Sequence, residues 1–281
     1  MRVLGVFEDP EDALEAWRKY VSETGYYAAI RSRPAPKGGK RTYEVWAYDE
    51  RCLLRRYIDA SHYELRELAK HYLRTTKIAQ SMRLALRSLP HGLIYDILES
   101  SLNEKQALIK RIEPLIEPHP VYRWCKLVRA GRGSLGASTA LIYLGFIDPH
   151  EATTAGKVWA FWGLSPAGKR RRGERAKGRF DLKGVAVFAA TRVVMGRDPY
   201  YRPYWEAKRS YYLDVKGFGR KKAADKATFW LAKLLASHAW EIYRKSEDLP
   251  TNPHRLYIAP KEHEDQEAEP EIVKKLARGE V

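Results

Sequence analysis

The sequence has few of the residues that build disulfide frameworks, metal sites or membrane spans. Of its 281 residues only two are cysteines, Cys52 and Cys125, and three are methionines. The cysteines lie far apart in the chain, so they form neither a metal-ligand spacing nor a disulfide framework. No apolar run approaches the roughly twenty residues that cross a bilayer, and the first residues show no signal-peptide pattern. These absences predict a cytoplasmic protein with no membrane contact, metal or other cofactor.

Positive charge is what the sequence has in excess. It carries 51 lysines and arginines against 35 acidic residues, which gives a formal net charge of +16. This excess favours a polyanionic partner, because bound phosphates release counterions and relieve self-repulsion. A generically basic protein is the alternative, and the clustering of the charges disfavours it. The scarcity of asparagine, glutamine, cysteine and methionine, with 31% charged residues, is typical of a thermophile.

The hydrophobic pattern predicts a mainly α-helical fold with a small N-terminal α+β unit. Residues 1–58 read as strand, helix, strand and strand, and the helix begins at Asp9 and Pro10. Residues 59–120 predict a long helical hairpin, whose second helix is ended by Pro114, Pro118 and Pro120. An intramolecular antiparallel pair and a homodimer formed through this hairpin explain the pattern equally well.

The remainder of the chain predicts a helical domain and a tail. Residues 121–256 carry apolar residues at helical spacing, with a glycine-containing turn between the first two helices. Residues 257–281 are acidic and are predicted to be disordered, apart from a short helix around 272–276. By charge complementarity, this tail could regulate the protein by occupying a basic loop.

The turn between the first two helices of this domain is a candidate phosphate site. Glycines flank Arg132, and a second helix begins near Ser134. The start of a helix presents unpaired N–H groups, and Ser134 can cap them or leave them to a phosphate. A purely structural turn would show the same glycines. The predicted nucleic-acid contacts here are Arg129, Arg132, Gly133 and Ser134.

Two basic segments follow this turn. The first, 168–179, lies between apolar helices and contains three glycines, which favours a phosphate-binding loop over a solvated charge run. The second, 216–226, precedes the apolar helix 227–243, in which His238 is interpreted as a packed core residue. The predicted contacts are Lys169, Arg170, Arg171, Arg172, Arg175, Lys177 and Arg179 in the first segment, and Lys216, Arg220, Lys221 and Lys222 in the second.

The order of these features resembles the C-terminal half of the bridge-RNA-guided insertion-sequence transposases, a family of serine-dependent DNA recombinases. The resemblance covers residues 61–255 and rests on four segments: WCKLVRAGRG at 124–133, KVWAFWGLSP at 157–166, the basic segment 168–179, and the closing helices with YYR at 200–202 and LLASHAWE at 234–241. It implies a helix–hairpin–helix in the helical domain and a DNA-binding role in a mobile element. Structured RNA is an alternative partner.

Two departures from the family pattern limit what the resemblance implies. The family's N-terminal nuclease domain carries four metal-binding acids, and the stretch before residue 61 is too short for it. The family's nucleophilic serine follows the Gly-Leu-x-Pro loop, where this sequence has Ala167 before Gly168. Ser165 is the nearest hydroxyl, and as a nucleophile it would need an activating base or positive charge. The leading prediction is therefore a protein that binds the backbone of DNA, and the resemblance implies branched or distorted DNA. An active recombinase with Ser165 as its catalytic residue is the alternative.

Overall fold

The structure is a computed structural model, and it describes residues 2–7, 11–12, 15–16, 19, 28–33, 42–47, 50–85, 92–165, 179–251 and 257–280. It is mainly helical, as the sequence predicts. The chain forms two compact units, residues 1–64 and 65–281, and the boundary between them falls within helix α2.

The first unit contains a three-stranded antiparallel sheet in the order β1-β3-β2, formed by β1 (Arg2–Phe7), β2 (Ala28–Arg33) and β3 (Thr42–Ala47). Val45 of the central strand lies opposite Ile30 of β2. β-Branched and aromatic residues in these segments favour extended backbone. Described residues between 11 and 19 are helical, so the predicted order of strand, helix, strand and strand is confirmed.

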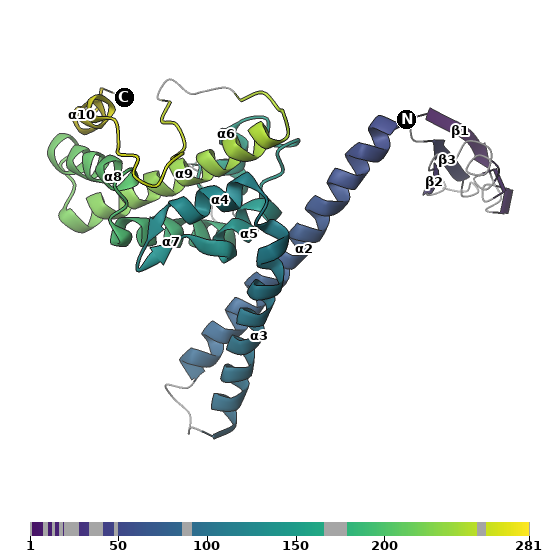
Figure 1. The fold of residues 1–281 in the computed structure, drawn as a ribbon, viewed down its shortest axis with the longest axis horizontal. Helices are drawn as coiled ribbons and strands as arrows, with labels where there is room; N and C mark the ends of the chain where they lie inside the picture. The colour runs from purple at the N-terminus through teal and green to yellow at the C-terminus, as the bar shows by residue number, and fades with distance from the viewer. Residues whose placement is uncertain are drawn as a thin grey trace, which may run out of the picture. The chain divides into compact units, whose positions relative to one another are not determined.

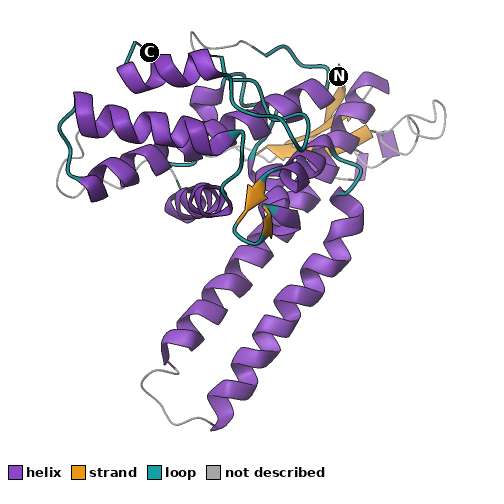
Figure 2. Ribbon diagram, turned by 60° about the vertical axis from the view of Figure 1, so that its left-hand side comes forward, coloured by secondary structure: helices purple, strands orange, loops and turns teal. Residues whose placement is uncertain are grey.

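Helices α2 (Glu50–Ala85) and α3 (Gly92–Ile116) form the predicted hairpin and run antiparallel within one chain (Figures 1 and 2). The Lys105 ammonium lies 5.1 Å from the centre of the Tyr72 ring. Of the three prolines predicted to end the second helix, Pro114 lies inside it, and the helix ends at Ile116, before Pro118. A proline disrupts the turn before it, but later residues can stay helical. Ile112 and Ile116 are both buried one turn apart, and this burial carries the helix past the proline.

The rest of the second unit consists of short helices around one long helix. The elements are α4 (Pro120–Leu127), β4 (Arg129–Ala130), β5 (Gly133–Ser134), α5 (Gly136–Phe146), α6 (Ala155–Phe161), α7 (Phe180–Gly196), α8 (Tyr201–Ser210), the π-helix η1 (Tyr211–Val215), α9 (Arg220–Ser246) and α10 (Pro270–Arg278).

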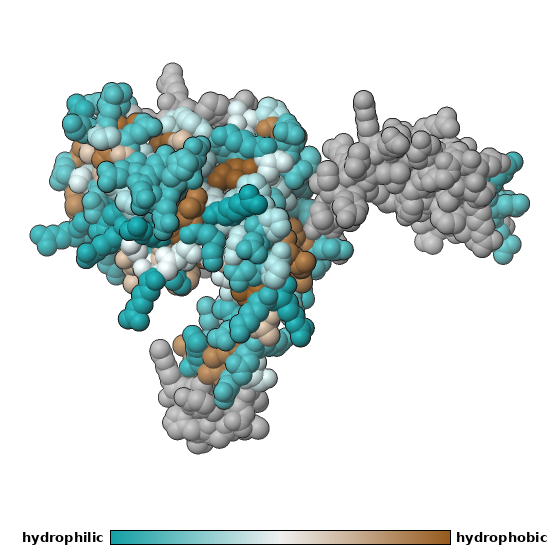
Figure 3. Space-filling model, in the orientation of Figure 1, coloured by the Kyte–Doolittle hydropathy of each residue, from teal (hydrophilic) through white to brown (hydrophobic). Residues whose placement is uncertain are grey.

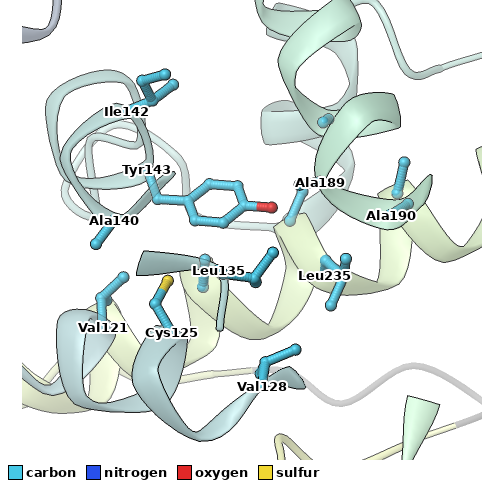
Figure 4. Close-up of a cluster of buried hydrophobic side chains, with 14 of the residues drawn as sticks. Val121, Cys125, Val128, Leu135, Ala140, Ile142, Tyr143, Ala189, Ala190 and Leu235 are labelled. Atoms are coloured by element: carbon cyan, nitrogen blue, oxygen red, sulfur yellow. The ribbon is translucent and has the colours of Figure 1, made fainter. Parts of the chain in front are cut away.

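Helix α9 is the centre of this unit and packs against α4, α5, α6, α7 and α8. Its buried residues are largely alanine and leucine at helical spacing, which lets the neighbouring helices approach closely. Figure 4 shows Leu235 of α9 facing Ala189 and Ala190 of α7, with the Tyr143 ring lying across the same cluster. The Tyr143 ring also stacks on Trp162, with 5.4 Å between ring centres. This core fixes the directions in which the surface residues of α6, α7 and α9 point.

The acidic tail does not behave as its composition predicts. Residues 257–280 are described, and within them Ile258, Lys261, Ala268 and Leu276 are buried. The Tyr200 hydroxyl donates to the Ala259 carbonyl at 2.6 Å. The prediction of a disordered tail is therefore wrong, because composition averages the segment while docking depends on a few anchoring side chains. The predicted short helix is present as α10, which packs against α8.

Candidate nucleic-acid interface

The glycine turn is a short β-hairpin that docks against the end of α7. Gly131 has φ of +62°, a conformation that favours glycine, and its N–H donates to the Arg192 carbonyl at 2.7 Å. A Cβ on Gly196 would lie 2.8 Å from the Gly131 nitrogen, so the helix and the hairpin touch through their backbones. Ser134 does not cap α5, whose N-cap residue, Leu135, makes no side-chain hydrogen bond. Phosphate contact by Ser134 stays a prediction.

Four exposed arginines surround this hairpin. Arg129 and Arg132 belong to the hairpin, and Arg192 and Arg197 come from the end of α7. The Arg192 guanidinium donates to the Ala130 carbonyl at 3.1 Å. Within the described part of the chain, the side chains of the other three arginines form no ion pair. We refer to the hairpin and these four arginines as the arginine turn.

A fully buried ion pair lies directly behind the arginine turn. The Lys261 ammonium of the tail lies 3.1 Å from Oδ2 of Asp198, and both side chains are 0% exposed. The same Oδ2 accepts the Arg129 N–H at 2.8 Å. Oδ1 accepts the N–H groups of Tyr200 and Tyr201, which caps the start of α8. Four donors therefore satisfy one buried carboxylate and join the turn, α8 and the tail.

His238 is a packed core histidine, as predicted from the sequence. Its Nε2–H donates to the Ile258 carbonyl at 2.7 Å, so Nδ1 accepts from the Tyr201 hydroxyl at 2.8 Å. The Tyr201 oxygen in turn accepts the Trp124 indole N–H at 3.1 Å. Burial lowers the pKa of His238 to about 4. The imidazole is therefore neutral near pH 7 and holds the tail against α8 and α9.

A second basic surface runs along α9. Lys222, Lys226, Phe229 and Lys233 recur at i, i+4, i+7 and i+11. At 100° per residue they lie within an arc of about 60° on one face of the helix. Burial, and then the charge of Lys226, lower the pKa of Lys233. We call these four residues the α9 stripe. The predicted basic segment 216–226 contains only the first two of these residues, although the spacing of Phe229 and Lys233 could have indicated the rest.

Two aromatic rings lie beside the C-terminal end of the α9 stripe. The Lys233 ammonium lies 5.4 Å from the ring centres of both Phe229 and Trp159, the latter on α6. The ammonium of Lys183, on α7, lies 5.0 Å from the centre of the Phe229 ring. Trp159 and Lys183 are distant from α9 in sequence, so only the packing of α6 and α7 on α9 brings them to the stripe.

Three of the predicted nucleic-acid contacts, Arg220, Lys221 and Lys222, lie together in the first turn of α9. The first turn contains no acidic residue, and Gly219 offers no side chain to cap it. The N-terminus of a helix carries partial positive charge, so cations there are electrostatically unfavourable. Lys216 lies just before this turn, with its ammonium 5.5 Å from the centre of the Tyr211 ring. These predicted contacts therefore share one end of α9, where a bound anion would relieve the repulsion.

The first basic segment is only partly described. Lys169, Arg170, Arg171, Arg172, Arg175 and Lys177 lie outside the described residues. At one border the Ser165 N–H donates to the Trp159 carbonyl at 3.1 Å, and at the other the Arg179 N–H donates to the Phe161 carbonyl at 2.9 Å. Both borders therefore adjoin α6, next to the α9 stripe. The Arg179 guanidinium is paired with Asp181 at 2.6 Å.

The structure separates the arginine turn from the α9 stripe. The turn docks at Arg192 and Gly196, whereas Lys183 reaches the stripe from the first turn of α7. The 13 residues from Lys183 to Gly196 span about 20 Å of helix axis. The predicted contacts of 129–134 and 216–222 thus form two surfaces, and the borders of 166–178 belong with the second.

Other kinds of site are not evident in the part of the chain that the structure describes. No group of three or more His, Cys, Asp or Glu side chains there could hold a metal ion. None of the helices described is both long and apolar enough to span a bilayer. In the view of Figure 3, hydrophilic residues cover most of the helical unit and separate small hydrophobic patches.

Comparisons of the chain with protein-family models, with curated proteins and with solved structures find no match.

Proposed function

We propose that this protein binds DNA through the phosphate backbone, as a relative of a transposase domain in a mobile element. The observation that carries the proposal is the cluster of cations in the first turn of α9, which contains no acidic residue and continues into the α9 stripe. A fold gains nothing from three cations at a helix N-terminus. A polyanion placed there would interact favourably with the side chains and with the helix end.

Lysines at these positions support backbone binding rather than reading of sequence. An ammonium is a point charge that a phosphate satisfies, whereas the planar guanidinium of arginine is better suited to bidentate recognition. The two exposed positions of the α9 stripe, 222 and 226, are both occupied by lysine. The arginine turn supplies a second set of cations about 20 Å along α7. Two separated surfaces suit branched or distorted DNA, in keeping with the resemblance of the sequence.

The test is the salt dependence of DNA affinity, measured by fluorescence anisotropy with a labelled duplex and a labelled four-way junction. Wild-type affinity should fall steeply with salt. The double variant Lys222→Gln/Lys226→Gln should bind more weakly and lower the slope of log K against log salt by about 1.8, because each lost phosphate contact contributes about 0.9. A control with the same change in net charge is Lys110→Gln/Lys274→Gln, two exposed lysines on α3 and α10. Wild-type binding that ignores salt, or an equal loss in the control, would contradict the proposal.

Catalysis through Ser165 is the alternative that the resemblance implies. Its backbone is held by Trp159 at the border of the basic segment. Incubation with supercoiled DNA, followed by denaturing electrophoresis, would detect a covalent protein–DNA adduct. An adduct that is absent in Ser165→Ala would replace the binding proposal with a recombinase. Competition between duplex DNA and a structured RNA at equal salt tests the RNA alternative in the same assay.

A further inference from the structure

The α9 stripe differs from a simple basic patch because two of its three lysines, Lys222 and Lys233, lie over aromatic rings. Lys222 lies over Phe218 at 4.2 Å, and Lys233 lies between the rings of Phe229 and Trp159. None of the four arginines of the arginine turn lies over an aromatic ring among the described residues. The two basic surfaces therefore offer different chemistry to a nucleic acid.

We propose that the α9 stripe, together with Trp159, binds an unpaired strand of DNA. The bases of this strand stack on the Phe229 and Trp159 rings, and its phosphates form ion pairs with the lysines. This inference rests on the proposed function and assigns one kind of DNA to one of its two surfaces. A positively charged track with aromatic platforms is the combination that holds single strands without sequence preference.

The ring of Trp159 is held in place before any ligand binds. Its indole N–H donates to the Lys233 carbonyl at 3.2 Å and lies 3.1 Å from the Ser237 hydroxyl, both on α9. The edge of the ring is therefore tied to α9, and the ring remains half-buried under the Lys233 ammonium. Phe229 is also half-buried and packs against the core. Rings fixed in this way lose little freedom when a base stacks on them.

A base can replace a lysine on these rings at little cost. The contact of an ammonium with a partly exposed ring is weak, and the stacking of a base on an aromatic side chain is stronger. The displaced ammonium of Lys233 then pairs with a phosphate of the same strand, in a charge-assisted contact. In a duplex the base faces are hidden by their neighbours in the stack. Only unpaired bases can therefore use the rings, whereas both forms of DNA can use the lysines.

The experiment compares a labelled oligothymidylate with a duplex of the same length at equal salt. Phe229→Leu removes the ring but keeps apolar bulk, and should weaken oligothymidylate binding about tenfold. Duplex affinity should change less than twofold. Phe229→Tyr retains a ring and should restore oligothymidylate binding. The matched control is Phe188→Leu, the same substitution at a 64% exposed site of α7 outside the stripe, which should change neither affinity.

The outcomes separate this inference from the proposed function. If wild-type protein binds neither DNA at low salt, the proposed function fails. If it binds both with steep salt dependence, but Phe229→Leu weakens both equally or neither, only the inference is overturned. A loss on Phe229→Leu that Phe229→Tyr does not reverse also overturns it, because the defect then lies in packing. An oligouridylate of the same length is the RNA arm, and a ring-dependent loss seen with it alone would overturn the choice of DNA.

Discussion

The arginine turn and the α9 stripe both present cations to solvent, but they are attached to the molecule differently. The arginine turn is held from behind by the buried Asp198 carboxylate, by the Arg192 carbonyl and by close contact with Gly196. The α9 stripe is exposed at Lys222 and Lys226 and half-buried at Phe229 and Lys233, and the opposite face of the helix forms the core. The difference is between cations on a rigid, tightly packed hairpin and cations on a regular surface.

This difference predicts where substitutions act. Groups behind the arginine turn are buried and hydrogen-bonded, so their loss should first lower the free energy of unfolding. Exposed side chains of the α9 stripe contribute little to stability, so their loss should affect DNA binding alone. Measurements of unfolding on matched variants test this contrast.

The largest effect is expected for Lys261→Met. The change leaves the fully buried Asp198 carboxylate without its counter-charge, and the loss of one partner of a buried ion pair costs about 3–5 kcal/mol. Urea denaturation followed by circular dichroism should show this loss. Lys275→Met in the exposed pair with Glu271 is the control and should unfold like the wild type. A Lys261→Met protein as stable as wild type would show that the tail does not support the arginine turn.

A smaller loss is expected for Gly196→Ala. The new Cβ would lie 2.8–2.9 Å from backbone atoms of Ala130 and Gly131, and such overpacking costs about 1–3 kcal/mol. The better helix propensity of alanine offsets up to about 1 kcal/mol of it. Gly184→Ala in the same helix is the matched control, because nothing lies within 4 Å of its Cβ, and it should gain about 0.5–1 kcal/mol. Thermal unfolding measures the stability of both variants. An equal change in stability for Gly196→Ala and Gly184→Ala would contradict the close contact between α7 and the hairpin.

The smallest effect is expected for Lys222→Gln/Lys226→Gln. Both side chains are exposed, and surface substitutions usually stay within about 0.5 kcal/mol. Removing Lys222 relieves repulsion with the helix dipole but also loses its contact with the Phe218 ring, so the net change should stay small. Urea unfolding checks this in the same variant that should lose DNA affinity. A clear destabilisation would place these lysines in the support of the fold and would remove the contrast with the arginine turn.

The sequence predicts the elements of the fold better than their contacts. The helical hairpin, the glycine turn, the tail helix and the packed His238 follow from periodicity and glycine placement. The tail was mispredicted because Lys261 counts as one more charge in composition, yet it is fully buried against Asp198. Arg192 and Arg197 were missed as neighbours of the turn, because more than sixty residues separate Arg192 from Ala130 in the chain.

The sequence by itself determines the excess of positive charge, the mainly helical fold and the positions of the basic segments, because composition and periodicity are local properties of the chain. The tertiary structure alone decides that the predicted contacts form two surfaces. It also places Trp159 and Lys183 beside Phe229 and Lys233, although they lie on three different helices. The physical reason is the packing of α6 and α7 on α9, since the burial of their apolar faces fixes which polar faces meet at the surface.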